Sequence, residues 1–169
     1  RTEFLKAIPD ADWMTEDNRE DAKHKLKEMF FQVGIPTDKE GEPDWPKRAN
    51  ALNGKLGEGY FFNQEIATRL SLQHSMEKLT KTPNRRHWGG STPLEVNAFY
   101  GPKSNGLWIP AGILQKPFFD YENSDAQNYG SVGTVLGHEM SHGFDDNGRR
   151  YDAKGEMKDW WDAKTVEGF

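Results

Sequence analysis

Two histidines and one glutamate lie within a five-residue stretch, and their spacing suits the binding of a metal ion. His138, Glu139 and His142 form the pattern His-Glu-x-x-His. On an α-helix, residues four positions apart lie on the same face, so both imidazole rings can reach one Zn²⁺ ion at about 2.0–2.1 Å. Glu139 would lie beside the ion and accept a proton from a water molecule bound to it. The stretch therefore predicts the core of a zinc peptidase site, with Glu139 as the general base.

The alternative is an amphipathic helix that carries these histidines on its surface, because a motif of five residues also arises by chance. Val132 and Val135 precede the motif and Phe144 follows it. These side chains predict an apolar, buried helix over residues 130–143, with Ser131 as its N-terminal cap. Buried ionisable groups need partners, and a metal ion would be one for the histidines. The flanking residues therefore favour a zinc site over surface histidines.

A catalytic zinc site needs a third protein ligand. In one class of zinc peptidases this ligand is a histidine six residues after the second one, but here that position is Gly148, which excludes the class. A glutamate on a later helix is the usual alternative. Glu156 is near in sequence, but it lies in a turn-like context and we do not assign it. The third ligand must therefore come from elsewhere.

Two acidic residues, Asp145 and Asp146, follow the second histidine closely. A carboxylate often accepts the remaining N–H of a metal-bound imidazole and so fixes the orientation of the ring. The alternative is an ordinary acidic helix end, although acidic side chains there oppose the helix dipole. Both interpretations stay open, and Asp145 is the preferred partner of His142.

The preceding part of the chain predicts two helices. Thr15, followed by acidic residues, predicts the start of the first helix, and Gly34 predicts its end. A loop is expected over residues 31–45 and a second helix over residues 60–79. The candidates for buried positions on this second helix include Phe62 and Met76.

A β-hairpin is expected between these helices and the metal motif. Residues 95–100 and 107–111 favour strands, and a turn-rich segment separates them. A turn-rich tail follows the motif, in which Trp160 and Trp161 are expected to pack. These elements predict an α+β fold that is predominantly α.

Composition excludes several classes of protein. The net charge is −5 and the pI is about 5.6, which argues against nucleic acid as a partner because phosphate binding needs a dense basic face. There are no cysteines, so disulfides and thiolate metal sites are excluded. No apolar run approaches the roughly 20 residues that cross a bilayer, so no membrane segment is predicted in this chain. The chain starts at Arg1, which suggests a fragment or a processed piece.

Several stretches of the chain carry a more specific signal than the metal motif alone. Residues 96–100 are Val-Asn-Ala-Phe-Tyr, residues 110–119 are Pro-Ala-Gly-Ile-Leu-Gln-Lys-Pro-Phe-Phe, residues 128–130 are Asn-Tyr-Gly, residues 137–146 are Gly-His-Glu-Met-Ser-His-Gly-Phe-Asp-Asp, and Trp160 and Trp161 form a pair. In this order they resemble the signature segments of the neprilysin and endothelin-converting-enzyme family of zinc metallopeptidases, which are gluzincins. Weaker similarity extends back to Asp12, so the resemblance covers nearly the whole chain.

The resemblance implies a role for each matched position. His138 and His142 would bind one zinc ion, and Glu139 would be the general base. Asn97 and Ala98 would hold the backbone of the substrate, which agrees with an edge strand that pairs with an extended peptide.

Three apolar residues would form a specificity pocket. The resemblance implies that Ile113, Phe118 and Val135 line a site for the residue after the scissile bond. The alternative is that these three side chains are ordinary core residues.

The resemblance also implies that the chain is an internal fragment of a larger, two-lobed peptidase with a thermolysin-like catalytic lobe. Residues 1–60 would be the end of the helical second lobe, and residues 61–169 would be the start of the catalytic lobe, with its substrate-binding hairpin and zinc-binding helix. The third zinc ligand, a glutamate, would lie outside this chain. The expected partners are a peptide substrate and the remainder of the same peptidase. Family members are typically membrane-anchored or exported, which implies an extracytoplasmic location.

Two hypotheses about function follow. The first is a zinc metalloendopeptidase that hydrolyses peptides on the amino side of hydrophobic residues, with a zinc-bound water activated by Glu139. The second is a non-catalytic module, derived from a peptidase and retained as a structural or binding subunit. Under either hypothesis the chain alone is expected to be inactive and to bind metal weakly, because two histidines leave the coordination incomplete.

Overall fold

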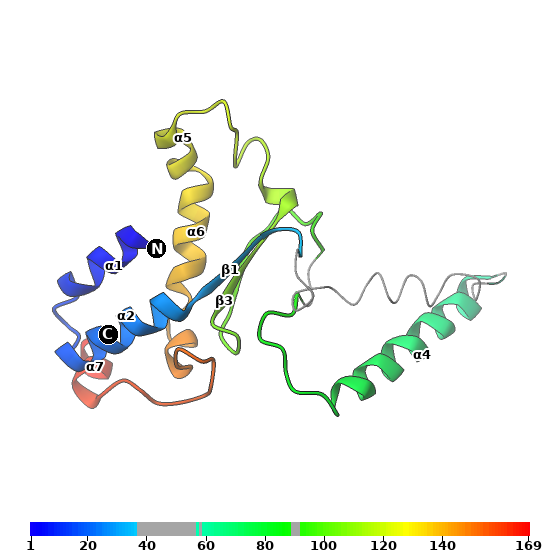
Figure 1. Ribbon diagram of the computed structural model, residues 1–169, viewed down its shortest axis with the longest axis horizontal. Coiled ribbons are helices and arrows are strands. Elements are labelled where there is room, and N and C mark those ends of the chain that lie inside the picture. Colours follow the sequence, from blue (N-terminus) through cyan, green and yellow to red (C-terminus); the bar gives the residue numbers. More distant parts are fainter. Residues whose placement is uncertain (37–56, 58, 89–91) are drawn as a thin grey trace. The chain divides into compact units, whose positions relative to one another are not determined.

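The computed structural model describes residues 1–36, 57, 59–88 and 92–169 (Figure 1). The chain divides into two compact units, one formed by residues 1–35 and 90–169 and the other by residues 36–89. The first unit contains the metal motif. The predicted lobe boundary near residue 60 stays a prediction.

The fold is mixed α+β with more helix than strand, as the sequence predicts. In chain order the elements are α1 (Thr2–Ala7), the 3₁₀ turn η1 (Ile8–Asp10), α2 (Glu16–Glu28), β1 (Phe30–Gly34), α4 (Tyr60–Lys78), β2 (Phe99–Gly101), β3 (Gly106–Pro110), η2 (Ala111–Ile113), α5 (Asp125–Gly130), α6 (Val132–Ser141), η3 (Gly148–Arg150) and α7 (Ala163–Gly168).

Helix α2 begins where the sequence predicts but ends earlier. Thr15 occupies its N-cap position, and acidic residues in the first turn with lysines in the last turn complement the helix dipole. The predicted continuation to Val33 and the predicted loop from residue 31 are both wrong over residues 30–34, which form β1. The aromatic and β-branched side chains of this segment suit a strand, and pairing with β3 decides the outcome. Residues 37–45 of the predicted loop lie outside the described residues.

Strand β3 is the centre of a three-stranded sheet with the order β1-β3-β2. β1 pairs with it in parallel, and β2 pairs with it in antiparallel orientation, which confirms the predicted hairpin. The predicted first strand is wrong over residues 95–98, because β2 begins only at Phe99. All five residues of β3 are buried. Phe30 of β1 lies against Gly106, where a Cβ atom would approach the phenyl ring to 2.3 Å, and stacks edge-on against Trp108 with ring centroids 5.3 Å apart. A glycine in β3 therefore makes room for the aromatic residue that begins β1.

Helix α4 of the second unit spans almost the whole predicted range. Two of its predicted buried residues are wrong, because Phe62 is 53% exposed and Met76 is 61% exposed. Apolar side chains occur on several sides of this helix, so its sequence does not define a single buried stripe.

The predicted helix over residues 130–143 is α6, which is shorter and covers Val132–Ser141, and the separate helix α5 precedes it and meets it at Ser131. Ser131 does not cap α6 with its side chain. Its hydroxyl instead donates to main-chain carbonyl oxygens of Phe118 and Gln127, at 2.6 and 2.9 Å. Ser124 caps α5 through a reciprocal pair of hydrogen bonds with Gln127.

The main core of the first unit lies between α2, the hairpin and α6, which runs beside the sheet in Figure 1. Leu26 and Leu107 are fully buried, and Met140 of α6 packs against the same cluster. Trp161 is buried and Trp160 packs against it, which confirms the predicted packing of this pair. Among the described residues, the helices are too short or too polar to span a bilayer.

Candidate metal centre

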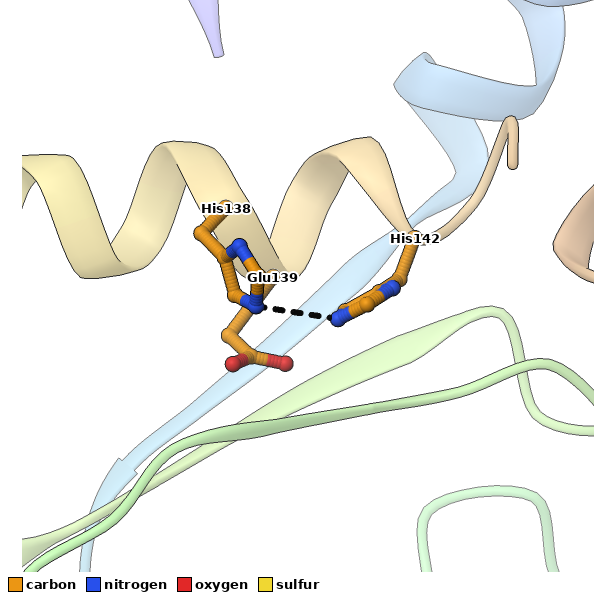
Figure 2. Close-up of side chains that lie close together, drawn as sticks. All are labelled: His138, Glu139 and His142. Carbon is orange, nitrogen blue, oxygen red and sulfur yellow. Dashed lines mark hydrogen bonds between the residues drawn. The ribbon is translucent and has the colours of Figure 1, made fainter.

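Helix α6 brings the side chains of the metal motif together. The Nε2 atoms of His138 and His142 are 3.1 Å apart, and Figure 2 shows both rings on the same side of the helix as Glu139. One ligand atom from each of the three side chains lies within 4.8 Å of the other two. His138 is exposed and His142 is half-buried, so the expectation of a buried helix is wrong at these positions.

These residues fit a zinc ion. Two nitrogen atoms that bind one tetrahedral Zn²⁺ at about 2.0–2.1 Å lie about 3.3 Å apart, close to the observed separation of the two Nε2 atoms. The Nδ1 atom of His142 lies 2.7 Å from Oδ2 of Asp145. When Nδ1–H donates to this carboxylate, the lone pair of Nε2 faces His138 and is available to a metal.

Asp145 is itself held in place by the turn that follows α6. Its Oδ1 atom accepts hydrogen bonds from the main-chain N–H groups of Asn147 and Gly148, at 3.0 and 2.7 Å. Burial opposes ionisation of Asp145, but these hydrogen bonds and the one to His142 outweigh it and lower its pKa. A charged carboxylate is therefore directed at the imidazole. Gly148 must be glycine here, because a Cβ atom would lie 1.8 Å from the carbonyl oxygen of His142.

Glu139 is the most buried of the three polar residues, at 8% exposure. Burial raises the pKa of its carboxyl group, while the adjacent histidines and a hydrogen bond from the main-chain N–H of Tyr100 lower it by less. Tyr100 belongs to β2, at one edge of the described sheet. The carboxylate thus lies between the two imidazoles and the edge strand of the hairpin.

A pocket of about 350 Å³ opens between the hairpin and α6. It joins the metal motif to β2 and to Ala98, one of the two residues that the resemblance implies would hold a peptide backbone. It is lined by Ala98, Phe99, Tyr100 and Pro102 on one side and by Glu139, His142, Asp145 and Asn147 on the other.

The remaining predicted site residues lie next to this pocket or behind it. Asn97 is exposed, and its side-chain oxygen accepts a hydrogen bond from the N–H of Ala98 at 2.9 Å. Ala98 packs in a small apolar cluster with Ile113, against which Phe118 and Val135 also pack. The structure therefore brings the three predicted pocket residues together, and packing between them fits both a pocket wall and a core.

Three residues of this region received no role from the sequence. Tyr100 contacts Glu139 through its main chain, and Asn105 and Lys25 are buried polar residues behind the site. The contact of Tyr100 is made by its main-chain N–H, which every residue except proline has, so the residue type does not predict it. Lys25 lies more than 100 positions before the metal motif, and helical spacing alone does not separate it from the exposed lysines nearby.

The chain is similar to known proteins in both sequence and structure. The family model described as Peptidase family M13 matches residues 97–169. An endothelin-converting enzyme homolog of Locusta migratoria is 37% identical over all 169 residues of the chain, which cover 23% of that relative. Neprilysin-3 of Drosophila melanogaster is 36% identical over the whole chain, which covers 21% of its length.

Solved structures give the same result. The zinc metalloprotease ZMP1 of Mycobacterium tuberculosis, in complex with an inhibitor, matches 97% of the chain with a TM-score of 0.77 and 32% identity. PepO of Lactobacillus rhamnosis matches 99% with a TM-score of 0.78 and 29% identity. The chain covers 24% and 26% of these two proteins, respectively.

Fold and site together resemble a segment of known zinc metallopeptidases. The chain is similar in sequence and structure to M13 peptidases, which confirms the predicted resemblance to the neprilysin and endothelin-converting-enzyme family. It spans about a quarter of the length of the relatives it matches.

Proposed function

We propose that residues 1–169 supply two zinc ligands and the general base of a zinc endopeptidase that cleaves peptides on the amino side of hydrophobic residues. The observation that supports this most directly is the arrangement of His138, Glu139 and His142, with the two Nε2 atoms 3.1 Å apart and the carboxylate beside them. The pocket between α6 and the edge strand offers space for a substrate next to these groups.

His138 and His142 would hold the metal through Nε2. A bound zinc ion would polarise the scissile carbonyl group and lower the pKa of water. Glu139 accepts a proton from the attacking water, and its partial burial strengthens this role because a raised pKa makes the carboxylate a better base. Asp145 keeps the Nδ1–H tautomer of His142.

The edge strand β2 and the residues before it would align the substrate. An extended peptide can pair with main-chain groups at the edge of a sheet, and side-chain pockets then select its sequence. Asn97 and Ala98 would provide these contacts, in which case the hydrogen bond between the Asn97 side chain and the Ala98 N–H must give way to the peptide. Ile113, Phe118 and Val135 would contact the hydrophobic residue that follows the scissile bond.

In this proposal, residues outside the chain complete the coordination of the zinc ion. Within the described residues, the grouping of possible metal ligands consists of His138, Glu139 and His142, and Glu139 has the role of base. We expect the third ligand, a glutamate, and the groups that stabilise the oxyanion from residues outside this chain. The remainder of the peptidase is thus the chain's first partner, and the family resemblance favours an extracytoplasmic location.

The test is Glu139→Gln in a protein that contains this chain together with the third ligand. The variant should retain one equivalent of zinc and lose turnover of a peptide with an internal hydrophobic residue by roughly 10²–10⁴-fold, because the amide cannot accept the proton. Glu167→Gln, which alters an exposed glutamate of α7, is the matched control. Full turnover by Glu139→Gln would refute the assigned role. An unaltered protein that folds without binding zinc or cleaving peptides would instead support the non-catalytic alternative.

A further inference from the structure

A buried lysine lies behind the metal motif. Lys25 of α2 is only 1% exposed, and its ammonium group donates hydrogen bonds to three main-chain carbonyl oxygens. The distances from Nζ are 2.6 Å to Gly143, 2.7 Å to Gly148 and 2.5 Å to Tyr151. All three acceptors lie within residues 143–151, the segment that follows α6 and includes η3. The three donors of one ammonium group thus match three carbonyl groups of one short segment.

Full burial of a lysine is unusual and costs free energy unless the charge is satisfied. Burial lowers the pKa of Lys25 to about 8, although Asp152 and Asp145 act to raise it. The rings of Phe144 and Trp160 lie 5.7 and 5.6 Å from Nζ. A methionine or leucine would fill this space without the cost of removing a charge from water. The presence of a lysine therefore suggests a role for the ammonium group itself.

The acceptors of Lys25 lead directly to the metal site. Gly143 follows His142 in the chain, at the C-terminal end of α6, where a positive charge is favourable. Gly148 accepts from Lys25 through its carbonyl oxygen and donates through its N–H to Asp145. The same carboxylate contacts Nδ1 of His142. The ammonium group is therefore connected to the imidazole in two ways, through Gly143 and through Gly148 with Asp145.

We propose that Lys25 is a positioning residue, which fixes the turn after α6 so that Asp145 holds the ring of His142 in the orientation and tautomer that bind a metal. The proposal rests on the metal site proposed above. Lys25 does not touch the ion or the substrate. It acts through main-chain groups, so its contribution depends on its three N–H donors and not on the bulk of its side chain.

The test uses the absence of cysteine from the chain. Lys25→Cys is alkylated in denaturant and refolded, either with an aminoethyl group, which restores an ammonium group at the same distance, or with a propyl group, which has the same length but no donor. Lys27→Cys, at an exposed position of the same helix, receives the same two groups as the control. The readouts are Co²⁺ affinity, hydrogen exchange of the Gly148 amide, and the ¹⁵N shifts of the His142 ring, which report its tautomer.

We expect the propyl form at position 25 to bind Co²⁺ about 10-fold or more weakly, since loss of a group that orients a histidine ligand costs about 10–100-fold. Its Gly148 amide should exchange faster, and His142 should lose its preference for Nδ1–H. The aminoethyl form should return all three readouts to near the unaltered values, and position 27 should show no difference between the two groups. Equal behaviour of the two alkylated forms at position 25 would overturn the proposal.

Two further outcomes are decisive. If the propyl form does not refold, Lys25→Gln replaces it, with a neutral amide that reaches at most part of the turn. This variant should show the same changes to a smaller extent, and unchanged affinity and tautomer would refute the positioning role. If the unaltered chain binds no Co²⁺, the metal site itself fails, while the tautomer of His142 and the exchange of Gly148 still decide the role of Lys25.

Discussion

At the scale of single residues, the metal motif was predictable because helical spacing alone places two histidines on one face. The sequence left open whether Asp145 supports the site or merely ends the helix. The structure places its carboxylate 2.7 Å from Nδ1 of His142 and holds it there with two main-chain N–H groups. The conformation of the turn decides this contact, and the sequence does not reveal that conformation.

Asp145→Asn should weaken metal binding by the chain about 10–100-fold. The amide has nearly the same size, but it carries no charge and can present its NH₂ group to His142, which would favour the wrong tautomer. Asp146→Asn is the matched control, because Asp146 is adjacent and exposed. Co²⁺ titrations of both variants measure the effect. Equal losses in the two variants would show that general electrostatics is responsible, and not the contact with His142.

At the scale of elements, the hairpin was predictable from its turn-rich loop. The hydrogen bonds that hold it to the rest of the unit were not. Asn105 ends this loop with a φ angle of 49° and is fully buried. Its side chain accepts from the hydroxyl of Tyr100 and donates to the carbonyl oxygens of Lys25 and Ala153, at 2.9–3.0 Å. The side chain of one asparagine thus forms hydrogen bonds to β2, to α2 and to the segment after η3. These partners are far from Asn105 in sequence, except for Tyr100.

Substitution of Asn105 should destabilise the chain. Asn105→Gly keeps the positive φ angle but leaves buried polar groups without partners, so the free energy of unfolding should fall by about 2–4 kcal/mol. Asn105→Ala should lose about 1 kcal/mol more, because a side chain with Cβ disfavours this backbone conformation. Urea denaturation of the two variants and the unaltered chain measures both differences. An unchanged midpoint for Asn105→Gly would show that the network contributes no net stability.

At the scale of the whole molecule, the fold class was predictable but the assembly of the first unit was not. Residues 30–34 were expected in a helix and a loop, yet they form the strand that pairs with residues 106–110. More than 70 residues separate the two strands, so local preference could not indicate that they meet. The core behind the site likewise joins α2 to the hairpin and α6, which lie on the two sides of this separation in the sequence.

The chain is much shorter than its relatives, and this bears on how strongly it binds a metal ion. The chain spans about a quarter of the length of its relatives and contains the metal motif, Asp145 and the edge strand. In our account the missing zinc ligand lies outside residues 1–169. The chain should therefore bind metal more weakly than a protein that includes that ligand, and both should use the same two histidines.

The most direct test is X-ray absorption spectroscopy at the zinc edge, on the chain loaded with one equivalent of Zn²⁺. We expect the spectrum to contain two imidazole ligands at about 2.0–2.1 Å, with oxygen ligands completing the shell. His138→Ala and His142→Ala should each remove one imidazole and most of the bound zinc. A first shell of oxygen atoms alone, or a spectrum that neither substitution changes, would contradict the claim that these two rings share one ion.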